Sequence, residues 1–176
     1  MRYTQLTLAC WHAQPEAILE IGTWNGERAL QLLQCAPRAR YYGFDLFEDA
    51  TDATDAEEMN VKPHNALAAV QQRLAGYEAQ LFKGNTRTTL AAFNEPVDFV
   101  WMDGGHSVET IASDWAHVRR LALPEAEIYL DDYYTGPIDV TKFGCNQLVA
   151  GLKHDVLPVR DAVKGGGYVQ MVRVWL

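Results

Sequence analysis

The chain has 176 residues, of which 48% are hydrophobic, and this is enough to bury a single core of ordinary size, so we expect one domain over residues 1–176. Its 23 acidic residues outnumber the 15 lysines and arginines, giving a formal net charge of −8. This balance argues against a basic face that grips nucleic acid or an anionic membrane, and it favours a small-molecule partner.

Short apolar runs alternate along the sequence with segments whose apolar residues recur at helical spacing. In chain order they predict a strand at 17–21, a helix closing near Pro37, a strand at 41–45, a helix around 66–74, a strand at 79–83, a helix at 86–93, a strand at 97–102, a helix at 107–121 and a strand at 127–130. Such alternation is typical of βαβ units and of a mostly parallel sheet covered on both faces. Ligands of these sheets bind at the carboxyl ends of the strands.

The C-terminal part of the chain follows a different pattern. Residues 154–159 and 168–175 are expected to be strands, and the three glycines at 165–167 a turn between them. The hairpin would close one side of the sheet. The predicted fold class is therefore α/β: a Rossmann-like three-layer sandwich with a seven-stranded, mostly parallel sheet and a C-terminal antiparallel hairpin.

Other features of the sequence carry weaker signals. Cys10, Cys35 and Cys145 are widely separated without a CxxC pair, which indicates reduced thiols. The first residues are too short and mixed for a secretion signal or membrane span, so a cytoplasmic protein is expected. Residues 45–58 form an acidic run without lysine or arginine, which we interpret as a solvated loop and helix start, with Asp45 considered separately.

Residues 20–26, Glu-Ile-Gly-Thr-Trp-Asn-Gly, lie where the first strand turns into the first helix. Glycines at both bends allow the backbone amides to approach a ligand closely. A dinucleotide fingerprint would need a glycine where Trp24 stands, and this disfavours pyrophosphate. Asp45 ends the second strand about twenty residues later, a position from which a carboxylate accepts hydrogen bonds from ribose hydroxyls. Together these features favour an adenosine-containing ligand without pyrophosphate.

With this loop and the acidic end of the second strand, nearly the whole chain resembles the class I S-adenosylmethionine-dependent methyltransferases. The resemblance implies that the glycine loop surrounds the methionine part of S-adenosylmethionine, that Asp45 holds its ribose, and that the segment after the third strand meets its adenine. The implied cofactor-binding residues are Glu20, Gly22, Thr23, Gly26, Asp45, Asn85, Thr86 and Asp103. Glu20 and the Asn85–Thr86 pair also fit simple helix caps, and that interpretation stays open.

A second group of polar residues is associated with the fourth and fifth strands. Asp103 and His106 follow the fourth strand, and Asp131 and Asp132 follow the fifth. Oxygen ligands brought together there suit a hard divalent cation, and a nearby imidazole suits a base that activates a hydroxyl. Further cysteine or histidine ligands, which zinc favours, are absent from these positions. Alternatively, Asp131 and Asp132 form a turn, and Asp103 serves the cofactor without any metal.

These residues resemble the cation-dependent, macrocin-type O-methyltransferases that act on sugar hydroxyls of natural products. The resemblance implies that Asp103, Asp131 and Asp132 bind Mg²⁺ or another divalent cation, and that His106 is the catalytic base beside Asp103. Those enzymes carry a longer N-terminal segment that covers the acceptor, whereas the first strand expected here begins at residue 17. Residues 41–74 or a partner subunit, as in a homodimer, would then supply the lid.

The remaining aromatic and histidine residues near these motifs are less informative. Tyr133 and Tyr134 either wall an acceptor pocket or belong to the core. The other histidines are expected at the surface or in packing: His12, His64, His117 and His154.

Three functions are compatible with these motifs. The leading one is metal-assisted O-methylation of a small hydroxylated acceptor by S-adenosylmethionine. The second is a nicotinamide-dependent oxidoreductase on a similar sheet, which Trp24 disfavours. The third is a non-catalytic binding module that keeps the methyltransferase-like fold. The acceptor itself is not identified, because acceptor pockets are built from variable loops.

Overall fold

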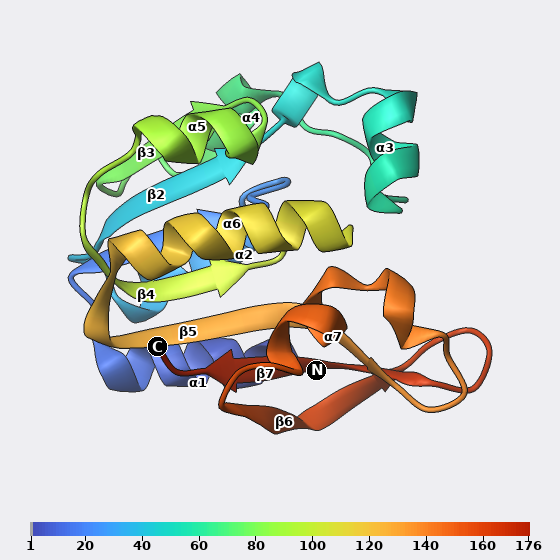
Figure 1. The fold of residues 1–176 in the computed structure, drawn as a ribbon. Coiled ribbons are helices and arrows are strands. Elements are labelled where there is room, and N and C mark those ends of the chain that lie inside the picture. Colours follow the sequence, from blue (N-terminus) through green and yellow to red (C-terminus); the bar gives the residue numbers. More distant parts are fainter. Residues whose placement is uncertain (1) are drawn as a thin grey trace.

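The computed structural model describes residues 2–176, which form a seven-stranded sheet in the order β3-β2-β1-β4-β5-β7-β6, with helices on both faces (Figure 1). The strands are β1 (Ala17–Ile21), β2 (Arg40–Asp45), β3 (Ala79–Lys83), β4 (Val97–Met102), β5 (Ala122–Thr135), β6 (His154–Ala162) and β7 (Tyr168–Val174). The helices are α1 (Tyr3–Ala13), α2 (Glu27–Cys35), α3 (Asp52–Glu58), α4 (Leu67–Arg73), α5 (Thr86–Ala92), α6 (Val108–Leu121) and α7 (Gly144–Val149), with short 3-10 turns at Phe47–Asp49 and Val140–Lys142.

The pairing of the strands confirms the predicted fold class. Strands β1 to β5 pair in parallel, and β7 pairs antiparallel with both β5 and β6. The chain runs outward from β1 through β2 to β3 and then returns to place β4 on the other side of β1. The strand order therefore reverses between β1 and β4, and sheets of this kind bind their ligands at the carboxyl ends of the strands beside that point.

Two hydrophobic clusters lie on the two faces of the sheet. Side chains of α1, α2 and α4 pack on one face, and side chains of α5, α6 and α7 pack on the other. The strands in the middle are buried on both faces: every residue of β1 is buried, as in the continuous apolar runs of parallel sheets. These two packed layers fix the strand ends, and the loops that follow them, in place.

The structure also contains elements that the sequence analysis did not predict. Helix α1 buries only Leu6 and Cys10, too few residues to produce a clear helical pattern. Helix α3 buries no residue and α7 is very short. In addition, β5 does not end before the aspartate pair, because its pairing with β7 continues to Thr135 across an irregularity between Leu130 and Tyr133. Asp131 and Asp132 therefore lie inside a bulged strand.

Two further observations bear on the predictions from composition. Within residues 2–176, no helix combines the length and the apolar character needed to cross a lipid bilayer. The cysteines are free: Cys10 and Cys145 are buried, and Cys35 is half-buried.

Candidate active site

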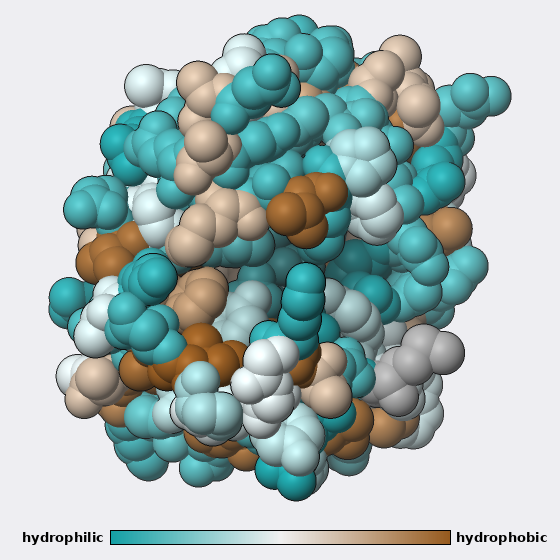
Figure 2. All heavy atoms as spheres, turned by 90° about the vertical axis from the view of Figure 1, so that its right-hand side faces the viewer, coloured by the Kyte–Doolittle hydropathy of each residue, from teal (hydrophilic) through white to brown (hydrophobic). Residues whose placement is uncertain are grey.

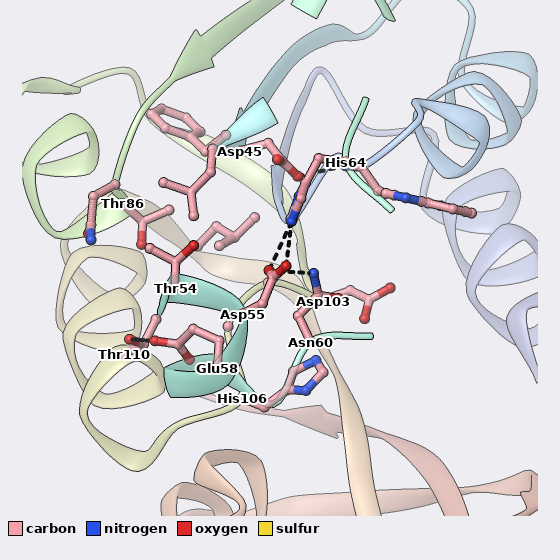
Figure 3. Close-up of a pocket in the computed structure, with 18 of the residues that line it drawn as sticks. Asp45, Thr54, Asp55, Glu58, Asn60, His64, Thr86, Asp103, His106 and Thr110 are labelled. Atoms are coloured by element: carbon pink, nitrogen blue, oxygen red, sulfur yellow. Dashed lines mark hydrogen bonds and ion pairs between the residues drawn. The ribbon is translucent and has the colours of Figure 1, made fainter. Parts of the chain in front are cut away.

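A pocket opens at the carboxyl ends of β1, β2 and β4, beside the point where the strand order reverses. The empty space inside it, including the part open to solvent, is about 970 Å³. Figure 2 shows this side of the molecule, where mostly hydrophilic residues surround a central hollow. Figure 3 shows the side chains that line it. Of the predicted site residues, those that line this pocket are Gly22, Asp45, Asn85, Thr86, Asp103 and His106.

Gly22 brings the loop after β1 into contact with the loop after β4. Its φ is +90°, a conformation that side chains with a Cβ rarely adopt. A Cβ built on Gly22 would lie 2.1 Å from the backbone oxygen of Asp103. The two backbones can meet only because residue 22 is glycine, and their contact joins the two groups of predicted site residues.

Asp45 ends β2 with its carboxylate fixed by two backbone amides. The N–H of Trp24 donates to Oδ2 and the N–H of Phe47 donates to Oδ1, each at 2.7 Å. Each carboxylate oxygen keeps a further lone pair. The side chain is thus oriented at the edge of the pocket and can still accept hydrogen bonds from ribose hydroxyls.

Asn85 and Thr86 line the same pocket from the segment between β3 and α5. The side-chain oxygen of Asn85 also accepts the N–H of Arg87 at 2.9 Å, so Asn85 is the N-cap of α5. Asn85 therefore both caps α5 and lines the pocket.

Glu20, Thr23 and Gly26 do not line the pocket, although the resemblance placed them around the cofactor. Glu20 is only 1% exposed, and Tyr41 donates its hydroxyl hydrogen to Oε2 at 2.6 Å. Thr23 is buried beside the same hydroxyl, 3.4 Å away. Gly26 faces α4, where a Cβ would lie 2.7 Å from Val70. In this structure the three residues pack on the side of the glycine loop that faces away from the pocket.

The burial of Glu20 predicts a pH dependence of stability. Burial raises the pKa of Glu20 to about 8, from an ordinary value of 4.5. Between these values the folded protein holds a proton that the unfolded chain has lost, so the contribution of Glu20 to stability falls as pH rises. We expect the wild-type protein to lose up to about 1.4 kcal/mol per pH unit relative to Glu20→Gln across this window. Urea unfolding at pH 5 to 8 measures the difference.

Glu16→Gln is the matched control for this prediction, because Glu16 is exposed and directly precedes the same strand. Its stability should follow that of the wild type at every pH. An equal pH dependence in wild type and Glu20→Gln would show that Glu20 is ionised in the folded protein.

Residues 46–66, which contain α3 and which we call the lid segment, form one wall of the pocket (Figure 3). His64 pairs with Asp55 at 2.9 Å, and the indole N–H of Trp24 donates to the carbonyl of Pro63 at 2.7 Å. The interpretation of residues 45–58 as a solvated run therefore misses their position at the site, although α3 itself buries nothing. His64 is exposed, as expected, and it also lines the pocket. Residues 46–66 thus form a wall of the larger pocket, and the expectation that residues 41–74 or a partner subunit cover the acceptor stays a prediction.

Glu58 joins the lid segment to the loop that carries His106. Its carboxylate accepts hydrogen bonds from the backbone N–H of Ser107 at 2.9 Å, from the Ser107 hydroxyl at 3.1 Å and from the Thr110 hydroxyl. A Cβ on Gly105 would lie 2.5 Å from the same carboxylate. Gly105 thus lets Glu58 reach the start of α6, and this contact holds the loop after β4 in place.

Asp103, His106 and Asp132 form the second half of the site. The His106 imidazole lies 2.9 Å from Asp132, and the three side chains can each bring one ligand atom to within 4.8 Å of the others. Burial lowers the pKa of His106, but the Asp132 carboxylate outweighs burial and the net pKa is raised. Burial, together with the charge of Asp131, raises the pKa of Asp103 to about 8. A positive charge near Asp103 would favour its ionised form.

Asp131 stands apart from this group. Both of its carboxylate oxygens are engaged by Arg2 and Tyr3, which lie at the start of α1. Of the three predicted metal ligands, the structure thus brings Asp103 and Asp132 together with His106, and holds Asp131 in a separate ion pair.

A smaller cavity of about 250 Å³ adjoins the first one on the side of β5. The two share the loop from Asp103 to His106, and Asp131, Asp132 and Phe143 line only the smaller one. Next to it, the ring of Tyr134 stacks on Phe143 with centroids 4.0 Å apart, and its hydroxyl lies 3.3 Å from Asp132. Tyr133 instead packs against the core. The aromatic wall beside the acid–base pair is therefore Tyr134 and not Tyr133.

Several residues at the site were missed by sequence reasoning. Glu58 and Asp55 belong to an acidic run in the sequence. Neither a capping pattern nor a charge pattern predicts which distant residues they contact. Arg2 and Tyr3 lie outside every motif. Lys62 lines the pocket beside Trp24, with its ammonium 5.6 Å from the indole ring, and also had no motif. A basic residue following a long acidic run was the single available signal.

Comparison with known proteins identifies the family. Residues 19–133, well over half of the chain, match the family model described as a methyltransferase domain. No protein with a curated description matches the sequence.

Solved structures share the fold at low sequence identity. The O-methyltransferase TomG from Streptomyces achromogenes, involved in tomaymycin synthesis and solved with S-adenosylmethionine, is 18% identical, has a TM-score of 0.68, and is matched over 97% of this chain and 78% of its own. An O-methyltransferase from Bacillus cereus, solved with S-adenosylhomocysteine, is 15% identical with a TM-score of 0.66, and the match covers 98% of this chain and 79% of that protein. An rRNA methylase from Streptococcus thermophilus is 14% identical with a TM-score of 0.67, and the match covers 100% of this chain and 98% of that protein.

Proposed function

The chain belongs to the methyltransferase domain family and is an S-adenosylmethionine-dependent methyltransferase, and from this premise we propose that it methylates a hydroxyl group of a small acceptor, with His106 as the base. The family match sets aside the nicotinamide-dependent and non-catalytic alternatives. The observation that carries the proposal is the His106–Asp132 pair: the two side chains lie 2.9 Å apart, His106 lines both adjoining cavities, and Asp132 lines the smaller one.

The larger cavity suits the cofactor. S-adenosylmethionine supplies a methyl group activated by a sulfonium charge. Asp45, held by two backbone amides, is placed to accept the ribose hydroxyls. Asn85 and Thr86 lie further along the wall for the adenine edge. Asp103 lines the larger cavity together with His106. The sulfonium charge of the cofactor would favour the ionised form of this carboxyl, whose pKa is raised by burial.

The acceptor hydroxyl would enter on the side of the smaller cavity, where it would meet His106. A hydroxyl is a weak nucleophile until its proton is removed, and His106 can accept that proton as the oxygen attacks the methyl carbon. The imidazolium that forms would be stabilised by Asp132, which already lies 2.9 Å away. Tyr134 and Phe143 would limit the shape of the acceptor.

A divalent cation such as Mg²⁺ would be held by Asp103 and Asp132, the two predicted carboxylate ligands that converge with His106. The donor set fits, because carboxylate oxygens suit a hard cation. When bound, the ion would lower the pKa of the acceptor hydroxyl.

The proposed acceptor is a small molecule, not RNA, although an rRNA methylase shares the fold. The net charge is −8, and the lid segment beside the pocket carries a dense acidic run. Binding a polyanion through such a surface would be opposed by electrostatic repulsion. A panel of hydroxylated compounds, screened for S-adenosylhomocysteine release, identifies the acceptor class; turnover on RNA alone would contradict it.

Calorimetric titration with S-adenosylhomocysteine tests the cofactor half of the site. We expect Asp45→Asn to weaken binding roughly 10- to 100-fold, because a charged acceptor of ribose hydroxyls is lost and each such bond contributes about 1.5–3 kcal/mol. Asp52→Asn is the matched control, since Asp52 is exposed on α3 and does not line the pocket. Unaltered affinity in Asp45→Asn, or no binding by the wild type, would contradict the assignment.

A further inference from the structure

Arg2 lies just before α1 and makes the most extensive ion-pair network of the acceptor side. Its Nε and Nη2 donate to the two oxygens of Asp131 at 2.9 and 2.7 Å, a two-pronged pair. Its Nη1 donates to Asp161 of β6 at 3.0 Å. The Tyr3 hydroxyl donates to Oδ2 of Asp131 at 2.9 Å. One guanidinium thereby connects α1 to strands β5 and β6.

The pair between Arg2 and Asp131 is buried. The Asp131 side chain is 1% exposed and that of Arg2 is 12% exposed. A buried carboxylate needs a counter-charge and hydrogen-bond donors, and Arg2 and Tyr3 supply both. Both carboxylate oxygens of Asp131 are thus hydrogen-bonded to Arg2 or Tyr3.

Alternation along β5 explains why adjacent aspartates have different partners. Tyr129 belongs to the hydrophobic cluster on the α1 side, and Leu130 belongs to the cluster on the α6 side. Asp131 continues the first series and meets Arg2, whereas Asp132 continues the second and meets His106. Asp132 also has a φ of +59°, which is unusual for a residue with a side chain.

We infer that Arg2 is the fixed cation of the acceptor side: it satisfies Asp131 and so removes Asp131 from the set of residues that meet a divalent cation. This inference rests on the proposed acceptor site and assigns a role to a residue outside every motif. The nearest approach of Arg2 to Asp132 is 3.8 Å, compared with 2.7 Å to Asp131. Asp131 is therefore the closer ion-pair partner of the Arg2 guanidinium.

Binding of Mn²⁺, followed by electron paramagnetic resonance, tests the inference without cofactor, acceptor or turnover. Arg2→Gln leaves Asp131 without its cation, so we expect Mn²⁺ to bind at least about tenfold tighter than to the wild type. Adding Asp131→Asn to Arg2→Gln should abolish that gain. Asp131→Asn alone should change the Mn²⁺ affinity of the wild type by less than about threefold.

Asp161→Asn is the matched control, because it removes one partner of Arg2 and leaves the pair with Asp131 intact. Its Mn²⁺ affinity should remain that of the wild type. Arg2→Lys keeps the charge without the two-pronged geometry and should lie between wild type and Arg2→Gln. If Arg2→Gln does not fold, Arg2→Lys and Asp131→Asn still decide.

Two results would overturn the inference. One is a loss of wild-type Mn²⁺ binding of tenfold or more in Asp131→Asn, which would show that the ion displaces Arg2 and uses Asp131. The other is equal affinity in the wild type and in the Arg2 variants. Because these measurements need no S-adenosylmethionine, a failure of the proposed methyl transfer is detected separately, by calorimetry and by acceptor turnover.

Discussion

Replacing His106 by glutamine is expected to lower kcat for methyl transfer by about 10²- to 10⁴-fold, the usual contribution of a positioned base. The amide has no basic nitrogen, so the acceptor hydroxyl keeps its proton when it meets the methyl group. The affinity for S-adenosylhomocysteine should change little, because Asp45, Asn85 and Thr86 are untouched. Single-turnover transfer to the acceptor found in the screen, combined with calorimetry, separates the two quantities.

His12→Gln is the control for this experiment, since His12 is exposed on α1 and does not line either cavity at the site. It should retain wild-type kcat and cofactor affinity. A His106→Gln variant with wild-type kcat would remove His106 from the role of base. A variant with normal kcat but a raised KM would instead indicate that the imidazole only binds the acceptor.

Replacing Gly22 by alanine is expected to destabilise the protein by about 2–5 kcal/mol and to abolish cofactor binding. A positive φ costs an alanine about 1–2 kcal/mol, and overpacking of a close contact costs about 1–3 kcal/mol more. The new Cβ would lie 2.1 Å from a backbone oxygen, where no flexible side chain can move aside. Urea unfolding gives the free energy, and calorimetry at low temperature gives the binding.

Gly76→Ala is the matched control for this substitution. A Cβ on Gly76 would meet no atom within 4 Å, and its backbone does not have a positive φ. This variant should unfold within about 1 kcal/mol of the wild type and bind the cofactor normally. Similar stabilities for the two alanine variants would mean that the loops after β1 and β4 can separate without cost.

The parts of the fold that were predicted correctly are those encoded locally. Apolar runs define β1, β2 and β4 because a buried strand is apolar over most of its length, and the polar residue that ends such a run marks the edge of the sheet. Asp45, Asp103 and His106 line the pocket at that edge. The parallel order of the strands follows from the helices between them.

The residues that were missed act through contacts between distant parts of the chain. Arg2 and Asp131 are 129 positions apart, and Glu58 and Ser107 are 49 positions apart. Nothing in a single sequence distinguishes these charged residues from solvated ones, because their partners are set by the folding of the whole sheet. The continuation of β5 past Asp132 depends likewise on pairing with β7, which is a long-range event.

The hydrogen bonds of Glu58 have a consequence for the order of events in turnover. The lid segment cannot swing away from the larger cavity while Glu58 holds the Ser107 amide and hydroxyl and the Thr110 hydroxyl. On the proposed function, opening for cofactor exchange would break these bonds and would free the loop that carries His106. The proposed base would then be held in place only while the cofactor side is closed, and one carboxylate would couple cofactor entry to acceptor activation.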